Sequence, residues 1–144
     1  MEDYYGAFLS RALDTESLLN GNRTVGSVHM GAISIECLLK SLIVERHNIT
    51  GWGSNQDGTM HGITNPGHEF IDAIHKLPEL RKRIPRNMIS YFERLQQPRI
   101  HYIDMRYDGV DLDDHSIQEW KEAYIRVRAW LLSQRSSILK GKRA

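Results

Sequence analysis

The chain has 144 residues, of which 40% are hydrophobic and 26% are charged, and its formal net charge is +1. This length and composition are typical of a single folded domain and argue against a disordered chain. The balanced charge excludes the general attraction to nucleic acid of a strongly basic domain, although a local basic patch is compatible with it. Cys37 is the one cysteine, which excludes an internal disulfide and gives no support for a cysteine-based metal site.

The N-terminal residues include acidic side chains and have no apolar stretch behind a basic region, so no secretory signal is expected there. We also expect no segment with the ~20 apolar residues that a bilayer-spanning helix needs. These two features predict a cytoplasmic protein without membrane contact.

Apolar residues at helical spacing predict a first helix that ends at the stop signal of residues 20–22, Asn-Gly-Asn. We expect its buried face to contain Tyr5, Phe8, Leu9, Ala12, Leu13 and Leu19. A second helix is predicted over residues 24–47. Its apolar stripe is formed by Val28, Ala32, Ile35, Leu39 and Leu42 and widened by Leu38 and Ile43. A stripe this wide indicates a helix that packs against more than one neighbour.

Residues 48–65 contain four glycines and no periodicity, which predicts a long surface loop. Asn65 and Pro66 then form a cap-and-start signal for a short helix that ends at Pro78. Its buried residues are expected to be Phe70, Ile71, Ile74 and Leu77. Pro85 is expected to open the next helix, with Ile89, Phe92 and Leu95 buried, and Pro98 to end or kink it.

The stretch that follows Pro98 is polar and aromatic, without a helical period. Ser116 and Glu119 match a capping box, which predicts that a last helix begins near Ser116 and runs to about Leu139. Its apolar face contains Trp120, Tyr124, Val127, Trp130 and Leu131. The basic tail of residues 140–144 is expected to fray. The sequence thus predicts one all-α domain, an up-and-down bundle of four to five helices.

The densest group of reactive side chains lies between residues 93 and 108. It contains Arg94, Arg99, His101, Tyr102, Asp104, Arg106, Tyr107 and Asp108. An imidazole moves protons near neutral pH, and a guanidinium group binds phosphate and stabilises charge that develops on it. Together they could cleave RNA by activating its 2′-hydroxyl without a metal. The alternative is that Arg99 and Arg106 pair with Asp104 and Asp108 in a structural loop.

Arg94 followed by His101, with six residues between them, resembles the ribonuclease motif of the HEPN family of small helical domains. Three further segments are similar to that family. HMGAISIECLLKSLI resembles its second helix, with Glu36 and Lys40, and HEFIDAIHKLPELRKRIP resembles a segment that opens with a histidine, here His68. HYIDMRYDG is similar to a tyrosine-and-RYPD stretch of one branch, here Tyr102, Arg106, Tyr107 and Asp108.

The resemblance implies a domain that acts on RNA or nucleotides as a homodimer. It implies His101 as the acid or base and Arg94 as the group that orients phosphate, without metal or cofactor. The residues expected to bind RNA or nucleotide are Arg99, Tyr102, Arg106, Tyr107 and His68, and those expected to support the site are Glu36 and Asp104. The alternative function is a non-catalytic nucleotide- or protein-binding partner of a nucleotidyltransferase, as in toxin–antitoxin or defence pairs.

Three other features have open alternatives. His47, His61 and His68 could imitate a metal site, but their spacing is irregular. Trp52 could stack a base or anchor its own loop. The basic run Arg81-Lys82-Arg83 with Arg86 could attract a phosphate backbone or form a solvated helix end.

Overall fold

The structure is a computed structural model that describes the backbone of residues 1–143 and the side chains of residues 1–140. It confirms the all-α prediction, since no strand occurs in the described part of the chain. The helices are α1 (Tyr4–Asn20), α2 (Thr24–His47), α3 (Phe70–His75), α4 (Pro78–Arg83), α5 (Arg86–Gln96), the 3₁₀ turn η1 (Asp104–Tyr107) and α6 (Asp114–Arg143). The described residues therefore form six α-helices in place of the four to five that we expected, because the segment between the loop and Pro85 forms two short helices.

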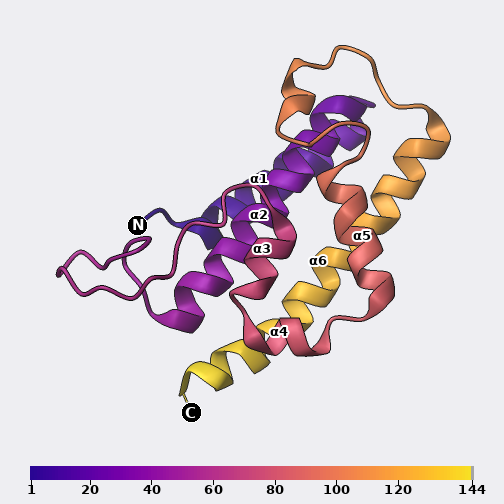
Figure 1. The fold of residues 1–144 in the computed structure, drawn as a ribbon. Helices are drawn as coiled ribbons and strands as arrows, with labels where there is room; N and C mark the ends of the chain where they lie inside the picture. Colours follow the sequence, from indigo (N-terminus) through magenta and orange to yellow (C-terminus); the bar gives the residue numbers. More distant parts are fainter. Residues whose placement is uncertain (144) are drawn as a thin grey trace.

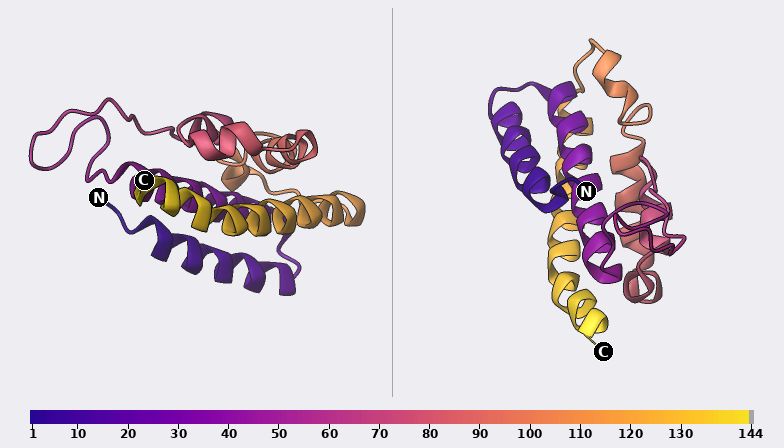
Figure 2. Two further views of the ribbon diagram at one scale, coloured as in Figure 1. Left: turned by 90° about the horizontal axis from the view of Figure 1, so that it is seen from below. Right: turned by 90° about the vertical axis from the view of Figure 1, so that its left-hand side faces the viewer.

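The helices lie in three layers (Figures 1 and 2). Helices α2 and α6 form the middle layer, α3, α4 and α5 cover one side of it, and α1 lies on the other side. Because α2 contacts helices on both sides, its apolar stripe has to be wide, as the sequence predicted.

Helix α2 is buried along most of its length, including Ala32, Ile35, Leu39 and Leu42. Among the described helices it alone is long and apolar enough to cross a membrane, with a mean hydropathy of 1.4, but 67% of that window is buried inside the fold. We expected no segment with the length and apolar composition of a bilayer-spanning helix, and α2 shows that this expectation was wrong. Packing in the core of a three-layer domain accounts for the apolar character of α2.

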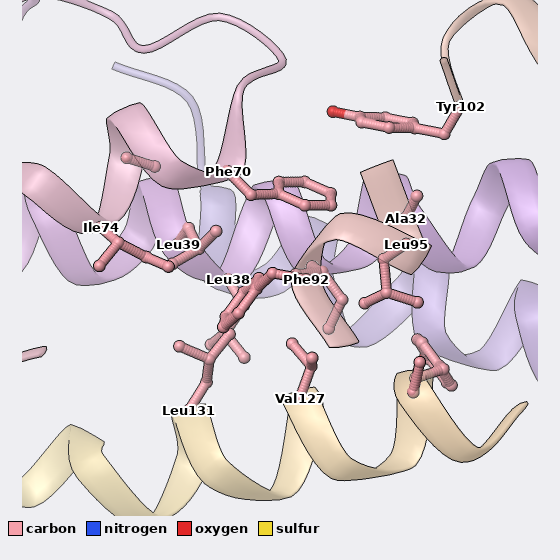
Figure 3. Close-up of a cluster of buried hydrophobic side chains, with 14 of the residues drawn as sticks. Ala32, Leu38, Leu39, Phe70, Ile74, Phe92, Leu95, Tyr102, Val127 and Leu131 are labelled. Carbon is pink, nitrogen blue, oxygen red and sulfur yellow. The ribbon is translucent and has the colours of Figure 1, made fainter. Parts of the chain in front are cut away.

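The core joins the middle layer to the α3–α5 layer (Figure 3). Phe70 of α3 packs edge-on against Phe92 of α5 at 6.1 Å between ring centroids, and Phe92 packs in the same way against Trp130 of α6. Trp130 remains half-buried, whereas Trp120, Tyr124, Val127 and Leu131 are buried, so the predicted face of the last helix is confirmed. Full burial of one such side chain stabilises the fold by roughly 1.5–3 kcal/mol.

A close approach between α2 and α6 explains a glycine in the middle of α2. A Cβ atom at Gly31 would lie 2.4 Å from Cη2 of Trp120, which is 1% exposed. The indole therefore occupies the space that any side chain at position 31 would need.

Helix α1 packs on α2 and is less buried than we expected. Phe8 is buried, but Leu9 is 49% exposed and Leu13 is 67% exposed. The prediction of a single buried face containing these two leucines was wrong, because the face of α1 turned away from α2 remains uncovered.

Two helix starts also differ from the prediction. Asn65 Oδ1 accepts a hydrogen bond from the backbone N–H of Gly67 at 2.8 Å, so Asn65 caps a turn and α3 begins only at Phe70. Gly67 makes this turn possible because its φ is +65°. Pro78 is the first residue of α4, a position that suits proline.

The first turn of α6 is capped by Asp113. Its Oδ1 accepts the Ser116 N–H at 2.7 Å, so the helix begins at Asp114 and the predicted Ser116 capping box is wrong. The helix also continues to Arg143, past the expected end at Leu139. Helix α5 ends at Gln96, two residues before Pro98, as predicted.

The loop of residues 48–65 contains no helix, as predicted, and folds back on itself through an isolated bridge between Ser54 and Met60. Trp52 fastens this loop to α1, because its Nε1–H donates to the hydroxyl of Tyr4 at 3.1 Å. In this structure Trp52 therefore anchors its loop.

Candidate functional site

The site is built around Glu36, which lies near the middle of α2. Lys40, one turn later on the same helix, donates to Glu36 Oε2 at 3.0 Å. An acid placed four residues before a lysine is the favourable order on a helix. The Lys40 side chain is only 7% exposed, so its charge is committed to this pair.

The other carboxylate oxygen, Glu36 Oε1, receives two more hydrogen bonds. Nδ1 of His68 lies 2.6 Å away, and the Tyr102 hydroxyl also donates to it. Two chain segments beyond α2 therefore meet at one oxygen atom. His68 lies just before α3, and Tyr102 lies just before η1.

These partners keep Glu36 ionised. Burial alone would raise the pKa of Glu36, but the hydrogen bonds from Tyr102 and His68 and the charge of Lys40 outweigh it and lower that pKa below its ordinary value. Burial, together with the negative charge of Glu36, raises the pKa of Tyr102. Tyr102 is thus a hydrogen-bond donor at physiological pH.

The ring of Tyr102 is fully buried and held on several sides. It stacks on Phe70 at 5.1 Å, as Figure 3 shows, and on His101 at 4.8 Å. Its backbone N–H donates to Gln96 O at 2.9 Å, and its carbonyl lies 2.8 Å from Nδ1 of His29. The donor that meets Glu36 is therefore rigidly placed.

His101 makes different contacts from His68. Its Nδ1 accepts the backbone N–H of Ile103 at 3.2 Å, which assigns the proton to Nε2. This Nε2 is buried and lies 3.4 Å from Glu69 Oε1, within ion-pair range but without hydrogen-bond geometry. Both ring nitrogens thus face the protein, so the contacts of His101 fit the positioning of Tyr102.

His68 has one nitrogen inside the network and a side chain that is 50% exposed. Because Glu36 is ionised, Nδ1 carries the proton that it donates, and in the neutral imidazole this leaves Nε2 as the acceptor. No residue of the described chain hydrogen-bonds Nε2. The arrangement is a carboxylate that orients an imidazole whose second nitrogen is available to take a proton, a layout suited to general base chemistry.

The structure brings four of the predicted site residues together, namely Glu36, His68, Tyr102 and His101. It does not join the predicted pair of Arg94 and His101. Arg94 extends from α5 towards α6, where it lies 3.3 Å from Glu119 Oε2.

The remaining predicted residues lie outside this cluster. Arg99 forms a two-point contact with Asp108, at 2.6 and 3.1 Å, which matches the structural-loop alternative for this pair. Asp104, Arg106 and Tyr107 are exposed on η1, where the Arg106 guanidinium lies 4.8 Å from the Tyr107 ring.

One member of the site was missed by the sequence analysis. Gln96 links Glu69 to α3, because its amide donates to Glu69 and accepts the Phe70 N–H, each at 2.7 Å. The one signal in the sequence that could have indicated Gln96 is its position at the end of α5, two residues before Pro98. Cys37 adjoins Glu36 in the sequence, and burial raises the pKa of its thiol to about 11, so the thiol stays protonated at neutral pH.

The histidines weighed as a metal site make other contacts. Nε2 of His47 lies 2.6 Å from Lys76 O, and Nε2 of His61 lies 3.0 Å from Gly51 O. Among the described side chains, no group of three or more His, Cys, Asp or Glu could hold a metal ion.

Fold and site together define an all-helical domain with a buried carboxylate network beneath a surface histidine. No protein-family model, curated protein or solved structure matches the chain.

Proposed function

We propose that this protein is a HEPN-type domain that acts on RNA as a homodimer, and that it cleaves the strand without a metal through His68. The single observation that carries the proposal is the hydrogen bond of 2.6 Å between His68 Nδ1 and Glu36 Oε1, beneath a half-exposed imidazole. A carboxylate at Nδ1 fixes the tautomer and strengthens the other nitrogen as a base.

In this proposal, Nε2 of His68 removes the proton of a ribose 2′-hydroxyl. The freed oxygen attacks the adjacent phosphorus, the bond to the 5′-oxygen breaks, and the leaving oxygen takes up a proton. Glu36 stabilises the imidazolium that forms, while Tyr102 and Lys40 keep Glu36 in place. His101 acts through Tyr102 as a positioning residue, in place of the catalytic role that the family motif implies.

The homodimer part of the proposal is supported by an uncovered apolar face between α1 and α6. Its exposed side chains are Leu9, Leu13, Ile125 and Leu132, and a hollow lined by the three leucines has a volume of about 490 Å³. Glu16 of α1 and Arg128 of α6 line the same face. A twofold axis that sets α1 of one protomer against α6 of its partner would pair these opposite charges.

One observation favours the alternative of a non-catalytic partner of a nucleotidyltransferase. Arg94, the phosphate-orienting residue of the expected pair, is bound to Glu119 and has no contact with His101 among the described residues. A catalytic site made of Arg94 and His101 would then lack the guanidinium group that orients the phosphate.

Cleavage of single-stranded RNA in EDTA by the full chain and by His68→Ala distinguishes these functions. The proposal expects cleavage by the natural protein and at least a 100-fold slower rate for the variant. Absence of cleavage by the natural protein would leave the binding-partner function.

A further inference from the structure

The corner between α4 and α5 carries four exposed cationic side chains. Arg81, Lys82 and Arg83 end α4, and Arg86 begins α5. We call these four residues the α4 corner. The sequence contains no acidic residue between Leu80 and Phe92, so the corner has no acid within its own segment.

The nearest acid in the sequence is already engaged. Glu79 accepts from Arg46 of α2 at 2.7 Å. Burial raises the pKa of Glu79, but the hydrogen bond from Arg46 and the charges of Arg46 and Arg83 outweigh it and lower that pKa below its ordinary value. Within residues 1–140, no carboxylate pairs with any cation of the α4 corner, and Arg83 contacts only the amide oxygen of Gln134, at 3.3 Å. The four cations of the corner therefore have no ion-pair partner among the described residues, in a protein whose net charge is +1.

Helix α3 begins two residues after His68 and is followed by α4, which lies in the same layer of the fold (Figure 1). A hollow of about 360 Å³ lies along it, lined by Thr64, Asn65, Pro66, Asp72, His75 and Lys76. Helix α3 has six residues, which is about 9 Å of helix. A short strand can therefore span from His68, past the hollow, to the α4 corner.

The site at His68 needs a separate group of cations to bind the RNA backbone. Its one lysine, Lys40, is buried and paired with Glu36, so no free cation of the network faces a substrate phosphate. Arginine and lysine side chains at a surface supply most of the binding free energy for a nucleic acid backbone.

The surroundings of the corner distinguish a polynucleotide from a membrane. A membrane-binding helix sets exposed apolar side chains beside its cations. None of the large exposed hydrophobic side chains of the described residues lies within residues 61–99, the segment that contains the α4 corner.

We infer that the α4 corner is the backbone-binding subsite for the RNA that the proposed function places at His68. The strand runs along α3, and its phosphates contact Arg81, Lys82, Arg83 and Arg86. This inference rests on the proposed function for the position of the reacting phosphate but concerns binding alone.

The test compares binding of a fluorescein-labelled oligouridine to the full chain and to Arg81→Gln/Lys82→Gln, by anisotropy over a range of salt concentrations. Each lost phosphate contact lowers the slope of log affinity against log salt by about 0.7. The double variant should therefore bind at least tenfold more weakly at low salt, with a slope reduced by about 1.4. Arg11→Gln/Arg23→Gln removes the same charge from the α1 side and should bind like the natural protein.

Four outcomes overturn the inference: no binding by the natural protein, equal binding by both double variants, equal slopes, or tighter binding to phosphatidylserine vesicles than to the oligonucleotide. His68→Gln separates the inference from the proposed function. If RNA is never cleaved but binding depends on the corner, the inference stands and the nuclease proposal fails. If cleavage depends on His68 but Arg81→Gln/Lys82→Gln binds RNA like the natural protein, the α4 corner is not the binding subsite, and the nuclease proposal is unaffected.

Discussion

Oε1 of Glu36 lies 2.6 Å from Nδ1 of His68, and the two residues are 32 positions apart in the sequence. This contact turns the imidazole so that Nε2 faces away from the carboxylate. Because Tyr102 and Lys40 also bind Glu36, the carboxylate has little freedom to move, and the orientation of His68 is fixed by the fold.

Glu36→Gln should slow RNA cleavage about 10- to 100-fold, because an amide orients the imidazole poorly and cannot stabilise its charged form. Glu45→Gln is the matched control on the same helix, since Glu45 pairs with Arg135 away from the site. Single-turnover rates of the two variants measure the difference. Equal rates for Glu36→Gln and the natural protein would remove Glu36 from the mechanism.

Acid should weaken the fold through Glu36. Its pKa is lower in the folded protein, so its ionised form stabilises the fold above the ordinary glutamate pKa. This stabilisation is lost as the pH falls through the lowered pKa. Urea unfolding at several pH values should therefore show that the difference in unfolding free energy between the natural protein and Glu36→Gln shrinks on acidification. A difference that is constant with pH would contradict the assigned network.

Gly31→Ala should destabilise the protein by about 1–3 kcal/mol, because the new Cβ would overlap the Trp120 ring. Gly26→Ala is the control in the same helix. Its Cβ would lie 3.4 Å from Leu18 Cδ1, an ordinary contact, and alanine favours a helix over glycine by up to about 1 kcal/mol. Thermal unfolding should thus move in opposite directions for the two variants. Similar shifts would show that Trp120 does not pack on position 31.

Leu13→Asp should convert the proposed homodimer into monomers. Leu13 is 67% exposed, so the charge should change the stability of the protomer by only about 0.5 kcal/mol. Met60→Asp, at a residue 77% exposed in the loop, should stay dimeric. Sedimentation velocity measures both. A monomeric natural protein, or a dimeric Leu13→Asp, would rule out this interface.

Sequence patterns predicted the long helices well because their signals are local. In α2 and α6, apolar residues recur at helical spacing over several turns, so one residue that departs from the pattern does not change the prediction. The short α3 and α4 and the helix starts were harder. Asn65 and Ser116 fit cap patterns, but Gly67 and Asp113 supply the turn and the cap that the fold uses.

The sequence predicted most residues of the candidate site but not which of them contact one another. The motifs singled out Glu36, His68, Tyr102 and His101 separately, whereas spacing along the chain paired His101 with Arg94. Tyr102 reaches Glu36 from 66 residues away, and no local pattern encodes such a contact. Long-range packing of α3 and of the segment before η1 on α2 decides which histidine meets the carboxylate.

Single-turnover cleavage of RNA in EDTA by His68→Gln and by His101→Gln tests most directly whether His68 is the base. Removal of a general base should cost at least 100-fold for His68→Gln, and loss of a positioning residue less than tenfold for His101→Gln. Circular dichroism checks that both variants fold. The reverse order of rates, or no cleavage by the natural protein, would contradict the claim.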